Sequence, residues 1–387
     1  MKPAKPAYRP ATGGTRARCW VAVVAAVLAA CSSSKSERPA PLTEIKSPLS
    51  IRVAWRVRVG DGRRVFLEPA VVENAIYAAS AEGDLRRLDP GDGKEVWHVE
   101  APAPLGAGVG SDGFVVAVAS QRGDVYAYSA EGKLLWQARV PSDVVTPPLV
   151  GHGLVIVRST DQGVTAFDAQ NGRKKWIFTR QPPPLALRAP SDMAFSGDNV
   201  VAGFPGGRLV AIALSNGASR WDSPVSEPKG ATEVERLADV LGSIGQEDNQ
   251  VCAASYQGRV ACFDATNGEQ QWAREMPAGA GVAIEQEALV GVDSASTVEA
   301  FARSTGAARW SCKQLAHRGL SSPGVQDRWV AVGDAQGYVH FLNASDGKIV
   351  GRVELDGSPI IAQPRPVAGG VLVQSQRGHL ALLMPQG

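Results

Sequence analysis

The chain has 387 residues, of which 44% are hydrophobic, so it is long enough to bury a large core or to form an array of repeats. Its 40 basic and 38 acidic side chains nearly cancel to a formal net charge of +2, which argues against an electrostatic nucleic-acid-binding surface. With 42 glycines and only 6% aromatic residues, the composition favours an all-β protein with many turns.

The first thirty residues are predicted to be an export signal. Basic side chains without acidic ones precede the apolar run CWVAVVAAVLAA at 19–30, which is too short for a stable transmembrane helix. The run ends in LAAC at 28–31, which resembles the lipobox of bacterial lipoprotein precursors. That resemblance implies cleavage before Cys31 and acylation of its thiol and amine, and several acyl chains anchor a protein firmly.

The residues after the cysteine predict where the anchor goes. Ser32 stands where the inner-membrane retention signal of lipoproteins has aspartate, so the resemblance implies sorting to the outer membrane. The following stretch is polar and rich in Ser and Pro, as in flexible linkers. We therefore predict a signal peptide at 1–30, a lipidated cysteine with a flexible tether at 31–48, and a folded domain at 49–387 that faces the periplasm.

One sequence unit recurs about every forty residues in this domain. GVTAFDAQNGRKKW at 163–176 returns as GRVACFDATNGEQQW at 258–272 and, more loosely, as GDLRRLDPGDGKEVW at 83–97. Each unit is predicted to be a four-stranded antiparallel meander, since apolar strands alternate with turns whose glycines accept positive φ. The turn between the second and third strands occurs eight times, centred near Gly83, Gly123, Gly163, Gly207, Gly258, Ser296, Gly337 and Gly378.

The two ends of the domain predict how the array closes. The last unit lacks its fourth strand, and residues 51–60 supply a strand with Trp55 in the place of the repeat tryptophan. We therefore predict an all-β fold, an eight-bladed β-propeller of four-stranded antiparallel blades whose ring is closed by the N-terminal strand.

A tryptophan occupies the same place in seven of the units, and the remaining unit has Gly351 there. Because it recurs blade after blade, we expect each copy to pack against a turn of a neighbouring blade and not to form a ligand site. The seven are Trp55, Trp97, Trp136, Trp176, Trp221, Trp272 and Trp310.

The repeat resembles that of the pyrroloquinoline quinone (PQQ) propellers, so a periplasmic quinoprotein enzyme has to be considered. That resemblance would imply a central cofactor with calcium, often beside two adjacent cysteines. The sequence has no adjacent cysteines, no D-x-D-x-D spacing and no common hydrolase or nucleotide motif. Asp89, Asp168 and Asp264 recur in the repeat but are replaced in other units, as expected of turn residues. We therefore expect no catalytic residues, no cofactor and no metal site.

Two cysteines lie symmetrically about a predicted turn at Gln257–Gly258. Cys252 and Cys262 could form a disulfide in an oxidising periplasm, or remain two small buried thiols on neighbouring strands. Cys312 has no obvious partner in the sequence.

Two consecutive repeats are longer than the others. The tryptophan spacing is 45 and 51 residues across Trp176, Trp221 and Trp272, against 38 to 42 elsewhere. The additional residues, PPPLALRAP at 182–190 and EPKGATEVERLADVLGSIG at 227–245, fall between the fourth strand of one blade and the first of the next. Such connections emerge on one face of a propeller, so we expect neighbouring loops that form a binding surface.

The contents of these loops allow two interpretations. Leu185 and Leu187 either face a partner or begin an inner strand and are buried. In the second loop, Thr232 and Glu235 could form a capping box that starts a short helical turn.

The lipobox, the tether, the eight repeats and these loops together resemble the BamB family, the lipoproteins of the outer-membrane β-barrel assembly (BAM) machinery. In that family an L-x-L-R loop and an R-L-x-D-V-D loop bind the POTRA domains of BamA. LALR supplies Leu185, Leu187 and Arg188, and RLADVL supplies Arg236, Leu237 and Asp239 but has Leu241 in place of the second aspartate.

The resemblance implies a non-enzymatic outer-membrane scaffold that assists insertion of outer-membrane proteins. Its implied partners are BamA, the other lipoproteins of the complex and the membrane, with unfolded outer-membrane proteins as further candidates and no nucleic acid. Besides the quinoprotein enzyme, the alternative is a general peptide- or polysaccharide-binding propeller that uses the central channel or the face opposite the two loops.

Overall fold

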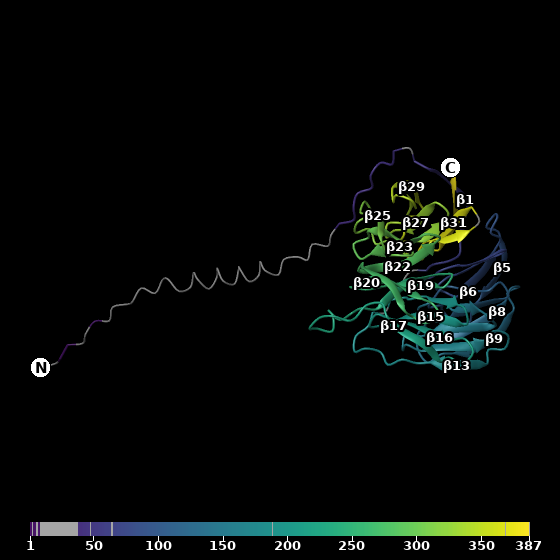
Figure 1. Cartoon of the computed structure of the whole chain (residues 1–387), viewed down its shortest axis with the longest axis horizontal. Helices are drawn as coiled ribbons and strands as arrows, with labels where there is room; N and C mark the ends of the chain where they lie inside the picture. The colour runs from purple at the N-terminus through teal and green to yellow at the C-terminus, as the bar shows by residue number, and fades with distance from the viewer. Residues whose placement is uncertain are drawn as a thin grey trace. The chain divides into compact units, whose positions relative to one another are not determined.

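The computed structural model describes residues 1, 3, 4, 7, 38–46, 48–62, 65–187, 189–367 and 369–386. Its strands form eight four-stranded antiparallel sheets, so the predicted eight-bladed β-propeller is confirmed. Figure 1 labels many of these strands. The predicted signal peptide and Cys31 lie outside the described residues, apart from residues 1, 3, 4 and 7. Within the described residues, no helix has the length and apolar character needed to cross a membrane.

Blades one to four follow the chain from its second strand. Blade one has β2 (Ala70–Val72), β3 (Ala75–Ala79), β4 (Asp84–Leu88) and β5 (Glu95–Glu100). Blade two has β6 (Gly110–Ser111), β7 (Val115–Ala119), β8 (Asp124–Ser129) and β9 (Leu134–Arg139). Blade three has β10 (Leu149–Gly151), β11 (Leu154–Arg158), β12 (Val164–Asp168) and β13 (Lys174–Phe178). Blade four has β14 (Met193–Ser196), β15 (Asn199–Phe204), β16 (Arg208–Ala213) and β17 (Ser219–Pro224).

Blades five to eight continue in the same order. Blade five has β18 (Val240–Glu247), β19 (Gln250–Ser255), β20 (Arg259–Asp264) and β21 (Gln270–Glu275). Blade six has β22 (Ala278–Glu285), β23 (Ala288–Asp293), β24 (Val298–Ala302) and β25 (Ala308–Cys312). Blade seven has β26 (Gly324–Gln326), β27 (Trp329–Gly333), β28 (Tyr338–Asn343) and β29 (Ile349–Glu354). Blade eight has β30 (Arg365–Val367), β31 (Gly370–Gln374), β32 (His379–Gln386) and β1 (Ser50–Arg58).

The N-terminal strand closes the ring as predicted. β1 pairs antiparallel with β32 from Ser50 opposite Gln386 to Arg58 opposite His379. A hydrophobic cluster that contains Trp55, Ile76 and Leu382 then joins the eighth blade to the first. Since each blade buries its faces against its neighbours, this closure leaves no end blade with an exposed apolar face.

The repeat tryptophans tie successive blades together. Each of the seven indole N–H groups donates to a backbone carbonyl in the turn between the third and fourth strands of the next blade, at 2.7 to 2.9 Å. Trp221, for example, donates to Ala265 of blade five at 2.9 Å. The glycine of that turn, Gly268, has φ +73° and lies under the ring, where a Cβ atom would be 2.6 Å from Cδ2 of Trp221. The glycine and tryptophan of the repeat thus act between blades.

This contact also accounts for the unit that lacks tryptophan. Gly351 lies on β29, and the next blade ends in β1, so no turn between its third and fourth strands is present to accept an indole N–H. A Cβ atom at Gly351 would instead lie 2.5 Å from Cδ1 of Ile51. The N-terminal strand occupies the space that the ring fills elsewhere.

The structure also shows the state of the cysteines and the role of the repeated aspartate. Cys252 and Cys262 are directly opposed on β19 and β20 and form a disulfide, while Cys312 is a buried free thiol. Asp168 accepts hydrogen bonds from the backbone of Gln170 and Asn171, as a turn residue does.

Candidate partner-binding surface

The two long connections lie side by side. The first insertion (residues 179–192) joins β13 to β14, and the second insertion (residues 225–239) joins β17 to β18. The backbone of Asp192 donates to Gly242 at 2.9 Å, and that of Gly242 donates to Pro190 at 3.0 Å. The structure therefore brings together segments about fifty residues apart. The stretch after Asp239, taken from sequence as part of the second loop, belongs to β18.

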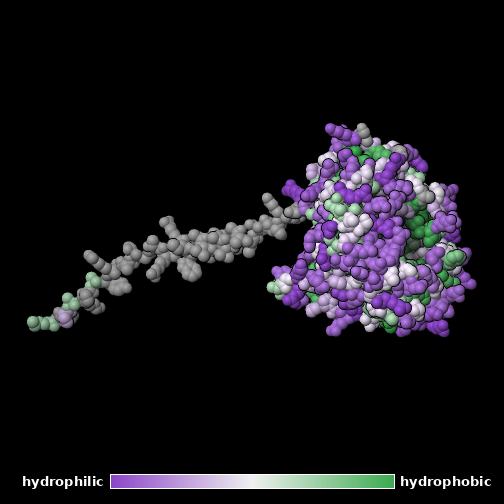
Figure 2. All heavy atoms as spheres, viewed as in Figure 1, coloured by the Kyte–Doolittle hydropathy of each residue, from purple (hydrophilic) through white to green (hydrophobic). Residues whose placement is uncertain are grey.

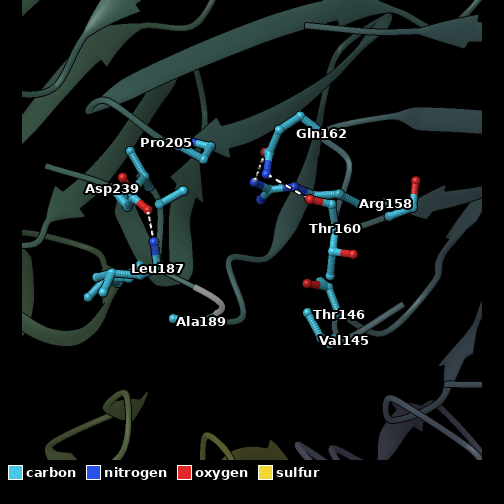
Figure 3. A pocket seen from close by; sticks show the side chains of 13 residues that line it. Val145, Thr146, Arg158, Thr160, Gln162, Leu187, Ala189, Pro205 and Asp239 are labelled. Carbon is cyan, nitrogen blue, oxygen red and sulfur yellow. Dashed lines mark hydrogen bonds between the residues drawn. The ribbon is translucent and has the colours of Figure 1, made fainter. Parts of the chain in front are cut away.

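Asp239 holds the two insertions together. It is only 4% exposed, and its Oδ2 accepts a hydrogen bond from the backbone N–H of Leu187 at 2.6 Å, drawn in Figure 3. Its Oδ1 accepts from the backbone N–H of Gly206 at 3.1 Å. Both oxygens of this buried carboxylate are therefore bound within the chain. The acid positions the first insertion.

The two leucines of the first insertion have different environments. Leu185 is 41% exposed, whereas Leu187 is partly buried against a core cluster that includes Leu241 and the disulfide. Leu241, which stands in place of the second aspartate of the BamB motif, is thus a core residue of blades five and six. Arg188 lies outside the described residues.

The second insertion contains a capped turn. Glu235 donates its backbone N–H to Oγ1 of Thr232 at 3.3 Å, and its Oε2 accepts from the backbone of Thr232 at 3.1 Å. This is the predicted capping box, although the segment forms a turn and no helix. The backbone N–H groups of Thr232 and Ala231 both donate to this carboxylate and lower the pKa of Glu235.

The outer part of this turn carries the exposed groups of the second insertion. Val234 is 60% exposed, and the half-exposed Arg236 donates to the carbonyl of Gly230 and pairs with Glu233 at 3.5 Å. Leu237 is 9% exposed and anchors the turn. Figure 1 shows the loop after β17 reaching out from the blades, and Figure 2 shows that the face in view is largely hydrophilic with small hydrophobic patches.

A small pocket lies behind the first insertion (Figure 3). Its volume is about 80 Å³, and Leu187, Asp239 and Arg158 are among its lining residues. Arg158 donates to the carbonyl of Ser191 at 3.0 Å, and its guanidinium lies 4.9 Å from the ring centre of Phe204. Burial lowers the pKa of Arg158 to about 10, so it remains charged at neutral pH. A cavity of this size holds a few water molecules or one partner side chain, not a cofactor.

A larger cavity of about 530 Å³ lies among the innermost strands. Glu68, which is 2% exposed, pairs there with Nε of Arg365 at 2.8 Å. Burial raises the pKa of Glu68 to about 7, with a further contribution from the charge of Asp192. Sequence inspection missed this pair, because no motif links residues about three hundred positions apart. No group of three or more metal-ligating side chains occurs in the described part of the chain.

These observations define the class of protein: an eight-bladed propeller with PQQ-type repeats and two coupled insertions on one face. A family model described as outer membrane protein assembly factor BamB matches residues 81–312. The BamB of Burkholderia pseudomallei is 43% identical over 371 residues, covering 95% of this chain and 97% of that protein. The BamB of Bordetella pertussis is 39% identical, covering 92% and 94%. The chain belongs to the BamB family.

Solved structures agree with this assignment. The crystal structure of BamB from Moraxella catarrhalis matches with a TM-score of 0.80 and 27% identity, covering 87% of this chain and 100% of that one. Quinohemoprotein alcohol dehydrogenase from Comamonas testosteroni matches with a TM-score of 0.67 at 14% identity. That second likeness is one of fold alone.

Proposed function

We propose that this outer-membrane protein assembly factor is a non-catalytic scaffold lipoprotein. In this proposal it is anchored through Cys31 in the outer membrane with its propeller in the periplasm, and it binds the POTRA domains of a BamA-like protein through the two insertions. Contacts with the other lipoproteins of the complex then follow through BamA. Family membership supports the general role. The observation that carries the site is the hydrogen bond from Leu187 to Asp239, which fixes one insertion against the other.

The surface offers the elements of a modest, specific interface. Leu185 and Val234 provide exposed apolar area, and Arg236 provides a charge at the rim. Leu187, Leu237 and Asp239 lie below them and set their positions. A partner side chain that enters the pocket near Arg158 would add an anchor.

A pair of exposed leucines tests the site. Leu185 is 41% exposed on the first insertion, and Leu134 is 45% exposed on β9 of blade two. The tagged lipoprotein is purified in mild detergent, and co-purifying proteins are quantified by mass spectrometry. Leu185→Asp should reduce recovery of the BamA-like protein, whereas Leu134→Asp should not, with both melting temperatures unchanged. Equal recovery with the two variants contradicts the site, and a wild-type protein that recovers no BamA-like protein contradicts the proposed function.

A further inference from the structure

Residues 39–49 precede the closing strand, and the sequence predicts a flexible tether over most of this stretch. Their described part instead makes hydrogen bonds with blade seven and the connection that precedes it. Ala40 donates its backbone N–H to the carbonyl of Ala316 at 2.9 Å, and Leu49 donates to Val350 at 2.7 Å. The compact unit of the chain accordingly begins at Pro39.

A buried arginine receives the first part of this segment. Arg318 is 2% exposed, and its Nη1 donates to the carbonyl of Ala40 at 2.9 Å. The rest of its guanidinium is fixed by Asp334, to which Nε donates at 2.7 Å, and by Oε1 of Gln336 at 2.6 Å. Asp334 is fully buried and also accepts from the backbone of Tyr338 at 2.9 Å. The arginine is thus rigidly oriented with one N–H group toward the segment.

A second arginine holds the middle of the segment through a buried histidine. Nη1 of Arg352 donates to the carbonyl of Thr43 at 3.3 Å, and its Nε donates to Nδ1 of His340 at 3.3 Å. Because Nδ1 accepts, the proton of the imidazole is on Nε2, which donates to Asp334 at 2.8 Å. Burial lowers the pKa of His340, which favours this neutral form. Asp334 therefore organises both arginines.

The position of Ala316 shows on which face the segment leaves the blades. Residues 313–323 connect the fourth strand of blade six to the first strand of blade seven. Because strands alternate in direction within each meander, all connections of this kind lie on one face of the ring. The two insertions are connections of the same kind, so the segment reaches the propeller on the face that carries them.

We propose that the described residues of this segment, 39–46, 48 and 49, act as a strap: blade seven and the connection before it bind them through Arg318, Arg352 and the Ala316 carbonyl, so that the chain leaves the propeller at Pro39 on the face of the two insertions. The strap would then also limit the distance between the propeller and the membrane, and this consequence rests on the lipid anchor at Cys31 in the proposed function. With the strap bound, eight residues separate Cys31 from the propeller, which extend to at most about 28 Å. With it released, the eighteen residues to Leu49 extend to about 60 Å.

Disulfide trapping tests the strap itself in the full-length protein. Ala40→Cys with Ala316→Cys places two thiols at adjacent backbone positions, and peptide mass spectrometry follows their link under mild oxidation. The matched control is Leu42→Cys with Ala316→Cys, since Leu42 is exposed. We expect the first pair to link severalfold faster. Equal rates, or no link, overturn the proposal, and neither result depends on lipid or on a BamA-like partner.

Energy transfer tests whether the strap limits the distance between the propeller and the membrane. A donor dye on Val234→Cys reports the distance of the insertion face from vesicles of phosphatidylethanolamine and phosphatidylglycerol that carry an acceptor lipid. Ala40→Pro removes the N–H that Ala316 accepts and leaves the blades unaltered, while Lys46→Pro changes an exposed residue of the segment that is not next to Ala40, Thr43 or Leu49. We expect lower transfer for Ala40→Pro than for wild type and Lys46→Pro. Equal transfer for all three overturns the orienting role, and failure of all three to bind vesicles contradicts the lipid anchor instead.

Discussion

Oδ2 of Asp239 and the backbone nitrogen of Leu187 are 2.6 Å apart, so a carboxylate of the second insertion holds the backbone of the first. Asp239→Asn replaces one charged acceptor by an amide and weakens at least one of its two backbone hydrogen bonds. Charge-assisted bonds of this kind contribute about 1.5 to 3 kcal/mol. We expect the variant to lower affinity for the BamA-like partner by about tenfold or more, measured by calorimetry with its purified POTRA domains.

The exposed Glu233 in the same insertion provides the control. Glu233→Gln removes a charge there and should leave affinity within a factor of about two, because surface ion pairs contribute little. If both variants bind alike, Asp239 does not position the interface.

Contacts between blades predict that two glycine-to-alanine substitutions destabilise the protein to different extents. Gly268→Ala and Gly153→Ala both place a Cβ at similar positive φ, +73° and +71°, which costs about 1 to 2 kcal/mol. Only Gly268 lies under a ring, that of Trp221, whereas nothing lies within 4 Å of a Cβ at Gly153. Gly268→Ala should therefore reduce the free energy of unfolding by about 1 to 3 kcal/mol more, as measured by urea denaturation. Equal losses would mean that the ring does not rest on this glycine.

The buried carboxylate of Glu68 predicts that the stability of the protein depends on pH. The pKa of Glu68 is raised from its ordinary 4.5 to about 7, so the folded protein holds this proton more tightly than the unfolded chain. The resulting stability is fully present below pH 4.5 and is lost as pH rises through 7. Glu68→Gln should then stabilise the protein at pH 8 by up to about 3 kcal/mol and have little effect near pH 5. Thermal unfolding at both pH values measures this, with exposed Glu131→Gln as the control. A uniform effect at both pH values contradicts the raised pKa.

The disulfide of blade five makes a further prediction. Cys252 and Cys262 are ten residues apart on paired strands, and a loop this short restricts the unfolded chain by between about 2 and 3 kcal/mol. Reduction should lower the melting temperature of the wild type but leave that of a Cys252→Ala/Cys262→Ala variant unchanged. Cys312 is buried, and burial raises its thiol pKa, so it should react with thiol reagents only after unfolding. An equal response of both proteins to reductant would show that the bond does not contribute.

The periodic features of the sequence were sufficient for the fold. A glycine and a tryptophan recur about every forty residues because the indole of one blade packs on the glycine turn of the next. Counting these repeats therefore predicted the number of blades and the closure of the ring. The same contact explains the exception, since Gly351 faces β1 and Ile51 where no turn exists. The neighbouring position of the two insertions also followed, because strand number fixes the face on which each connection emerges.

Only the tertiary structure decided which groups face outward. Leu185 and Leu187 are alike in sequence but differ in exposure, and Asp239 is an acceptor for backbone N–H groups rather than a surface charge. The Glu68–Arg365 pair and the sites of Arg318 and Arg352 likewise depend on the closed ring. The sequence by itself determined the repeated blade and the number of blades, because every blade packs by the same contacts. The direction of a single side chain and the pairing of two distant residues are not repeated from blade to blade. They depend on how the eight blades pack together, so only the tertiary structure decided them.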